Sequence, residues 1–275
     1  MTFDYEFVGK VGSMALIRKE DNDIDYNIFS RIGLELSPGW IWVSSGATEI
    51  GRIDYMKRNN GKELEGDIDE VKTDYAAQGQ VILMENYRRF INPTFSVRQI
   101  LLEHQHFNDS EKCDHIRKLL YRCREQQAIP IINYNDSVSS DENRKMELRN
   151  LRKSADHIVE CVDNDETAAT VATLVKAKYL ILLTSVNGIY ADPQKPETLI
   201  KEISGANTYE LINNIRSAQQ NCIGASRTGA NGAKAKLEFI IEPVKNGTTV
   251  IIGHARNKLS DLISGSVDRT IIRVR

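Results

Sequence analysis

Two consecutive stretches decide the fold of this chain: Val162-Asp163-Asn164-Asp165-Glu166-Thr167 and, after an apolar helical pattern, Tyr179-Leu180-Ile181-Leu182-Leu183-Thr184-Ser185-Val186-Asn187-Gly188-Ile189-Tyr190. The first predicts a helix start, because carboxylates suit the positive end of a helix dipole. The second is a continuous apolar run that ends in small polar residues, which is typical of a buried parallel strand. Together they predict half of a parallel α/β unit. Ligands of such sheets lie beyond the carboxyl ends of the strands, so we expect both polar clusters to face one crevice. The alternative is an ordinary helix cap followed by an ordinary buried strand.

Length and composition describe an ordinary globular chain. Its 275 residues are 41% hydrophobic and 27% charged, enough for one large α/β domain or two closely packed lobes. The formal net charge of −2 argues against general nucleic-acid binding, which needs clustered Lys and Arg. No apolar run approaches the roughly 20 residues of a membrane span, and the first residues do not resemble a signal peptide. We therefore expect a cytoplasmic protein with no membrane or nucleic-acid partner.

Cysteine and histidine spacing predicts no metal site held by side chains. The four cysteines lie far apart without a Cys-x-x-Cys pair, as expected of reduced thiols. His104 and His106 are one residue apart, but no third ligand follows at a useful spacing.

The rest of the chain alternates between strand and helix patterns. Strands are predicted at 5–11, 40–43, 97–102, 128–133 and 248–253, and helices at 25–36, 73–90, 109–127, 208–217 and 233–240. Residues 59–66 are predicted to form a loop, and residues 262–274 a closing pair of strands. Residues 137–155 are charged and lack an apolar period. We expect them to form a long surface segment that is either a lid over a site or a solvated insertion or oligomer contact.

Several predicted strands end in polar residues or glycine, and these ends can converge. They are Lys10 before Gly12-Ser13, Ser45-Gly46, Asn133 to Asp136, and Thr184-Ser185, to which Asn164, Asp165 and Lys236 are added. A lysine near the end of a buried strand is costly unless it meets an anion, although it can also snorkel at a sheet edge. Two lysines, two aspartates and glycine turns suit phosphoryl transfer, in which catalysis is mainly positioning and charge neutralisation. Neither a P-loop nor a Gly-x-Gly-x-x-Gly motif is found in the sequence.

Seven segments carry a resemblance to a known family. They are Val8-Gly-Lys10-Val-Gly-Ser, Val43-Ser-Ser45-Gly-Ala, Ala76-Ala-Gln-Gly-Gln, Gln99-Ile-Leu-Leu, Ile129-Pro-Ile-Ile-Asn133-x-Asn-Asp136, Val162-Asp-Asn164-Asp165 and Leu182-Leu-Thr184-x-x-x-Gly188-Ile-Tyr. In order and spacing the chain resembles the amino acid kinase superfamily, and within it the glutamate 5-kinases, from Phe7 to about Val274. No counterpart of the RNA-binding-like (PUA) domain found at the C-terminus of many members is expected.

The resemblance implies a fold and a reaction. The fold would be a three-layer α/β/α sandwich around a mainly parallel sheet, a single domain over 1–275 with an acceptor-binding lobe (1–160) and an ATP-binding lobe (161–275). The reaction would be phosphorylation of the γ-carboxylate of glutamate by ATP with Mg²⁺, the first step of proline synthesis. A homo-oligomer is implied, with the downstream glutamyl phosphate reductase as a further partner.

The resemblance also implies roles for individual residues. Lys10 and Lys236 would neutralise the transferring phosphoryl group, and Asp165 would orient them. The amino acid would be held by Ser45, Gly46, Asn133, Asp136 and Asn164. ATP would be bound by Lys10, Gly12, Ser13, Thr184, Ser185, Tyr190, Asp192, Gly229, Gly232 and Lys236.

The chain departs from the family pattern at four places. It has Thr184-Ser185 where the family has Thr-Asp, and Tyr134 where the family usually has Glu. The family's glycine loop is present only as Gly229-Ala-Asn-Gly232-Ala-Lys-Ala-Lys236, and the segment 137–160 is longer than in the family. Three interpretations therefore stay open: a glutamate 5-kinase, a sister kinase for another small carboxylate or phosphate acceptor, and a sensor that binds nucleotide or amino acid without turnover.

Overall fold

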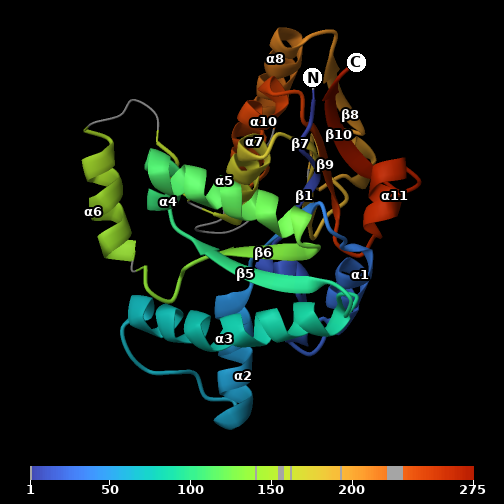
Figure 1. The fold of residues 1–275 in the computed structure, drawn as a ribbon. Helices are drawn as coiled ribbons and strands as arrows, with labels where there is room; N and C mark the ends of the chain where they lie inside the picture. The colour runs from blue at the N-terminus through green and yellow to red at the C-terminus, as the bar shows by residue number, and fades with distance from the viewer. Residues whose placement is uncertain (1, 140, 154–157, 162, 193, 222–231) are drawn as a thin grey trace. The chain divides into compact units, whose positions relative to one another are not determined.

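The computed structural model of the chain describes residues 2–139, 141–153, 158–161, 163–192, 194–221 and 232–275 (Figure 1). Its strands are β1 (Tyr5–Val11), β2 (Ile17–Arg18), β3 (Asp23–Ile24), β4 (Trp40–Ser44), β5 (Ser96–Leu102), β6 (Ala128–Tyr134), β7 (Ala177–Thr184), β8 (Glu202–Gly205), β9 (Thr249–His254) and β10 (Arg269–Val274). Its helices are α1 (Tyr26–Glu35), α2 (Ala47–Arg58), α3 (Ile68–Phe90), α4 (Gln105–Asn108), α5 (Ser110–Glu125), α6 (Asp141–Leu151), α7 (Asn164–Leu174), α8 (Thr208–Asn221), α9 (Gly232–Phe239), α10 (Ile241–Lys245) and α11 (Leu259–Ser264), with short 3₁₀ turns η1 (Ser13–Ala15) and η2 (Pro196–Thr198).

One large sheet organises these elements. Eight strands pair in the order β5-β6-β4-β1-β7-β9-β10-β8, and β2 pairs with β3 in a separate hairpin. The pairs β5–β6, β6–β4, β1–β7, β7–β9 and β10–β8 are parallel, and β9–β10 is antiparallel. This mainly parallel sheet with helices on its faces confirms the predicted α/β/α sandwich.

The chain divides into two compact units. The first comprises residues 1–11, 39–41 and 165–275, and the second comprises residues 12–38 and 42–164. Strand β4 begins in the first unit and ends in the second. No single position in the sequence separates the two units. Strand β1, at the start of the sequence, pairs with β7 along its whole length and therefore belongs to the first unit.

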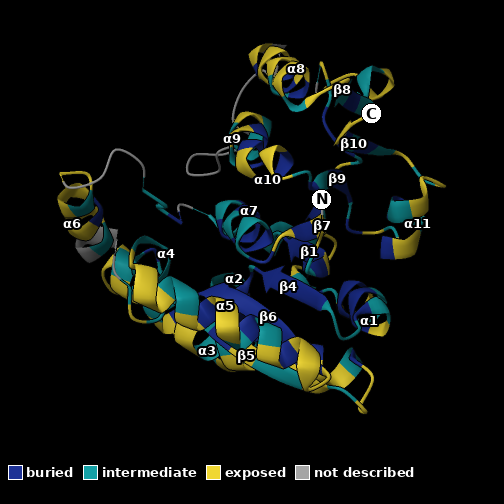
Figure 2. Cartoon of the chain, turned by 45° about the horizontal axis from the view of Figure 1, so that its top comes forward, coloured by how far each residue is buried: buried dark blue, intermediate teal, exposed yellow. Residues whose placement is uncertain are grey.

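In the first unit, helices cover both faces of the strands β1, β7, β9, β10 and β8. Helices α7, α8, α9 and α10 lie on one side and α11 on the other (Figures 1 and 2). The centre of β7, from Leu180 to Leu183, is buried, as expected of a strand with parallel neighbours on both sides. Phe7 stacks on Tyr179 across the β1–β7 pair, with ring centroids 5.1 Å apart.

In the second unit, β5 and β6 lie between α3 on one face and α5 on the other (Figure 1). Helices α2 and α3 approach each other closely, because each has a glycine at the contact. A Cβ atom on Gly51 would lie 1.9 Å from the carbonyl oxygen of Tyr75, and one on Gly79 would lie 1.8 Å from that of Ala47. Only glycine fits at either position, so a larger residue at either one would push α2 and α3 apart.

The sequence analysis was wrong or incomplete for several elements, and the short elements β2, β3, β8, α4 and α10 were not predicted. Residues 262–274 form the end of α11 and the single strand β10 rather than two strands, because Leu259 and Leu262 are buried one helical turn apart and Gly265 ends the helix at φ +79°. Helix α2 was not predicted, and α3 begins at Ile68, after the Asp67 cap, rather than at residue 73. The charged segment 137–155 contains α6, which the missing apolar period did not indicate.

None of the helices in the described part of the chain is long and apolar enough to cross a membrane.

Candidate functional site

Two lysines meet one carboxylate in the first unit. Lys10 lies near the end of β1, Asp165 in the first turn of α7, and Lys236 on α9. The Nζ of Lys10 is 2.8 Å from Oδ1 of Asp165, and the Nζ of Lys236 donates to Oδ2 of the same carboxylate. The side chains are only 9% (Lys10), 9% (Asp165) and 13% (Lys236) exposed. The structure thus brings together the three residues predicted to be catalytic.

This lysine cluster (Lys10, Asp165 and Lys236) has an excess of positive charge. Burial by itself would raise the pKa of Asp165, but attraction and hydrogen bonding from Lys10 and Lys236 outweigh it and hold the pKa below its ordinary value. Asp165 is therefore ionised, and one negative charge faces two ammonium groups. A largely buried site with a net positive charge favours an anion such as a phosphoryl group.

A second cluster, of amides and a hydroxyl, lies in the second unit. The side-chain amide of Asn164 donates to Oγ of Ser45 (3.0 Å) and to Oδ1 of Asn133 (2.9 Å). Asn133 in turn donates to Oε1 of Gln80 (2.8 Å) and accepts from the backbone N–H of Tyr134. Ser45 follows β4, Asn133 lies near the end of β6 and Gln80 lies on α3. Three predicted acceptor residues are thus joined by hydrogen bonds.

Two buried polar atoms of this amide cluster (Ser45, Gln80, Asn133 and Asn164) lack a hydrogen-bond partner among the described residues. Among the described residues, the buried Nε2 of Gln80 and the buried Oδ1 of Asn164 have no hydrogen-bond partner. A buried polar atom without a partner is costly, so each of these two atoms is suited to bind a water molecule or a ligand. One atom is a donor and the other an acceptor, which suits a carboxylate and an ammonium group. Sequence reasoning missed Gln80, although it is the last residue of the Ala76-Ala-Gln-Gly-Gln segment.

The other two predicted acceptor residues lie in turns of the second unit. Gly46 caps α2 with φ +110°, a left-handed conformation that favours glycine. Asp136 is half-buried in the turn that follows β6.

The predicted nucleotide residues are more dispersed. Gly12 precedes η1, which begins at Ser13, directly after β1. Thr184 ends β7, and its hydroxyl makes local hydrogen bonds to the backbone of Val186 (2.8 and 3.0 Å). Ser185 is exposed, Tyr190 bridges to Leu199, and Asp192 caps a turn at Gln194. Gly232 begins α9 at φ +57°, and Gly229 lies outside the described residues.

Asn164 of the amide cluster and Asp165 of the lysine cluster are consecutive residues at the start of α7. Among the residues that the structure describes, no group of three or more His, Cys, Asp or Glu side chains could hold a metal ion.

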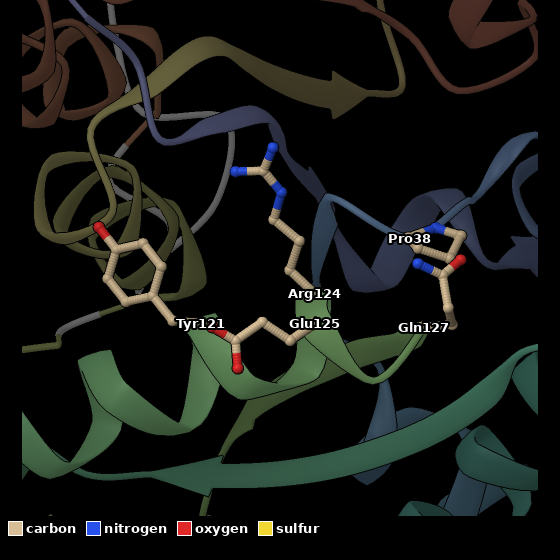
Figure 3. A pocket seen from close by; sticks show the side chains of 5 residues that line it. All are labelled: Pro38, Tyr121, Arg124, Glu125 and Gln127. Carbon is tan, nitrogen blue, oxygen red and sulfur yellow. The ribbon is translucent and has the colours of Figure 1, made fainter.

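A pocket of about 420 Å³ in the second unit is lined by other residues, near the end of α5: Pro38, Tyr121, Arg124, Glu125 and Gln127 (Figure 3).

Comparison with known proteins identifies the family. The profile of the Amino acid kinase family matches residues 7–254. The chain belongs to this family.

Relatives within the amino acid kinase family include several glutamate 5-kinases. That of Alkaliphilus metalliredigens is 28% identical over 278 residues, which cover 98% of this chain and 95% of that protein. That of Geobacillus thermodenitrificans is 32% identical over 204 residues, covering 72% of this chain and 49% of that protein. Glutamate 5-kinase 1 of Bacillus subtilis is 32% identical over 237 residues, covering 84% and 58%. The match thus spans about half the length of the Geobacillus and Bacillus relatives.

Solved structures of the amino acid kinase fold align over nearly the whole chain. Carbamate kinase from Giardia lamblia bound to AMP-PNP aligns with a TM-score of 0.60 at 15% identity, covering 98% of both chains. UMP kinase from Ureaplasma parvum aligns with a TM-score of 0.52 at 12% identity, again covering 98% of both chains. At these identities the alignments establish the fold.

Proposed function

We propose that this protein transfers the γ-phosphoryl group of ATP, used with Mg²⁺, to the side-chain carboxylate of glutamate. The observation that carries the proposal is the lysine cluster, in which two buried ammonium groups share one carboxylate. Membership of the amino acid kinase family and the glutamate 5-kinase relatives support the same reaction. The proposal includes the expected homo-oligomer, the cytoplasmic location and the downstream glutamyl phosphate reductase as partner.

The lysine cluster suits the charge changes of this transfer. A carboxylate oxygen of the acid attacks the γ-phosphorus, and the bond from that phosphorus to the bridging oxygen of ADP breaks, giving an acyl phosphate and ADP. Negative charge accumulates on the γ-oxygens and on the leaving ADP. Lys10 and Lys236 neutralise this charge, while Asp165 holds both ammonium groups in place and stays ionised.

The amide cluster suits recognition of an amino acid. In our proposal the free donor of Gln80 binds a carboxylate oxygen of the acid, and the free acceptor of Asn164 binds its ammonium group. Asp136 adds a negative charge for the same ammonium group. Ser45 and Asn133 hold the two amides in orientation through the hydrogen bonds already described.

A second candidate is a sister kinase that acts on another small carboxylate or on a phosphate acceptor. It is favoured by the two departures from the resemblance named above, Tyr134 beside Asn133 and the segment 137–160, which contains α6. The third interpretation, a sensor without turnover, is less compatible with the retention of both lysines.

An ATP-consumption assay on a panel of acids, with hydroxylamine present, tests the proposal. An acyl phosphate is trapped as its hydroxamate, whereas a phosphorylated phosphate acceptor is not. We expect ADP and hydroxamate in equal amounts with glutamate. ADP formation without hydroxamate on a phosphate acceptor would support the sister kinase, and saturable binding of ATP without turnover on any acceptor would support the sensor.

A further inference from the structure

Arg144 ties helix α6 to other parts of the second unit. The guanidinium of Arg144 donates to the carbonyl oxygen of Glu160 (2.8 Å) and to that of Cys161. Its central carbon lies 4.8 Å from the ring centroid of Tyr134, a cation–π contact. Among the side chains described on α6, from residue 144 to 151, only Leu148 is buried, so polar contacts attach this helix.

The contacts of Arg144 lie on both segments that lead into the amide cluster. Tyr134 is the last residue of β6, directly after Asn133 and two residues before Asp136. Cys161 is buried three residues before Asn164. One planar guanidinium therefore links the strand end that carries Asn133 to the segment that carries Asn164.

A histidine holds the same tyrosine and the same helix from the other side. Nδ1 of the buried His104 lies 3.3 Å from the hydroxyl of Tyr134, and its Nε2 lies 3.0 Å from the carboxylate of Glu147 on α6. Because a carboxylate only accepts, Nε2 is the donor to Glu147, and the Tyr134 hydroxyl donates to Nδ1 of the neutral ring. That hydroxyl also lies 3.1 Å from Oγ of Ser139, directly after the turn that contains Asp136.

We propose that Arg144, Tyr134, His104 and Glu147 form a brace that sets the acceptor specificity of this enzyme. Through the brace, α6 holds Asn133, Asp136 and Asn164 in the arrangement that binds the acid, so Arg144 and Tyr134 are positioning residues. The inference rests on the proposed function for the identity of the acid.

Substitution of Arg144 tests the positioning role. Arg144→Ala removes both carbonyl bonds and the ring contact, and Arg144→Lys keeps the charge but loses the planar group that makes all three contacts. We expect both variants to raise the KM for glutamate about tenfold or more, with the KM for ATP changed less than twofold. Arg149→Ala, an exposed arginine on the same helix, is the matched control and is expected to match the wild type.

Hydrogen exchange provides a readout that does not depend on turnover. The brace predicts that Arg144→Ala speeds amide exchange in peptides covering residues 133–139 and 158–166 together, while peptides from β1 and α3 are unchanged. Tyr134→Phe, which keeps the ring under Arg144 but loses the hydroxyl, is expected to speed exchange in 133–139 only.

The outcomes separate the two proposals. Unchanged exchange at both segments in Arg144→Ala would overturn the brace, whatever the enzyme phosphorylates. Faster exchange with an unchanged KM for the acid would overturn its role in specificity. If the wild type converts no acid to a hydroxamate, the proposed function fails, and the exchange measurement still decides whether the brace exists.

Discussion

At the scale of single residues, the charge balance of the lysine cluster makes a direct prediction. Lys10→Ala leaves Asp165 paired with Lys236 alone, so the site becomes neutral while its carboxylate keeps a partner. We expect kcat to fall by roughly 10² to 10³, with unfolding by urea almost unchanged. Lys19→Ala, at an exposed lysine, is the control. A Lys10→Ala enzyme with normal kcat would remove Lys10 from the chemistry.

Gln80 is the residue that the structure adds to the site. Gln80→Met keeps the length of the side chain but removes its amide, and with it both the bond to Asn133 and the free donor. We expect the KM for glutamate to rise by roughly 10-fold to 100-fold, since a lost hydrogen bond to a charged group costs about 1.5–3 kcal/mol, with the KM for ATP unchanged. Gln78→Met, on the same helix but bonded to Asp54 instead, is expected to leave both KM values near those of the wild type. Equal effects of the two variants would argue for general damage to α3.

At the scale of elements, the packing of α2 on α3 connects stability to the site. A Cβ atom added by Gly79→Ala would overlap the carbonyl oxygen of Ala47 and lie 2.4 Å from the backbone nitrogen of Gly51, so α2 must shift. We expect a net loss of about 1–3 kcal/mol in urea unfolding, because overpacking exceeds the gain in helix propensity. The KM for glutamate should also rise, since α2 begins directly after Ser45 and Gly46.

Ala77→Gly is the control for this prediction, because Ala77 is exposed on the same helix. Its expected cost of about 1 kcal/mol comes from helix propensity alone, so KM should not change. If Gly79→Ala lost stability without any change in KM, the start of α2 would not position Ser45.

At the scale of the whole molecule, His104 predicts how stability depends on pH. Burial lowers the pKa of His104 from its ordinary 6.5; Glu147, Glu103 and a hydrogen bond to Glu147 oppose this, and Arg144 adds to it. The folded chain therefore binds fewer protons than the unfolded chain below about pH 6.5. We expect the contribution of His104 to the free energy of unfolding to be fully present above about pH 6.5 and to be lost as the pH falls below that value.

Urea unfolding at pH 7.5 and pH 5.5 measures this dependence. His104→Asn should flatten the difference between the two pH values, whereas His115→Asn, at an exposed histidine, should leave it as in the wild type. An equal pH dependence in all three proteins would mean that His104 is protonated without cost in the folded state.

The sequence by itself determined the elements whose signals are local. Buried strands such as β7 show continuous apolar runs, and α1 and α5 begin at the aspartate caps Asp25 and Asp109. These patterns arise from hydrogen bonding and side-chain periodicity within a few residues, so the α/β class and the positions of these elements could be predicted. The polar residues at strand ends followed from the rule that parallel strands present their carboxyl ends at one edge.

Only the tertiary structure decided features that depend on distant partners. Helix α2 has glycine on its buried face, which weakens the apolar period, and it is acceptable only because α3 passes beside it. Helix α6 has one buried side chain among those described, and it is attached through Arg144 to Tyr134 and Glu160 and through Glu147 to His104, all of which lie outside the helix. The free atoms of Gln80 and Asn164 appear only once every other hydrogen bond of the amide cluster is assigned, because satisfaction of a polar group is a property of its surroundings and not of its residue type.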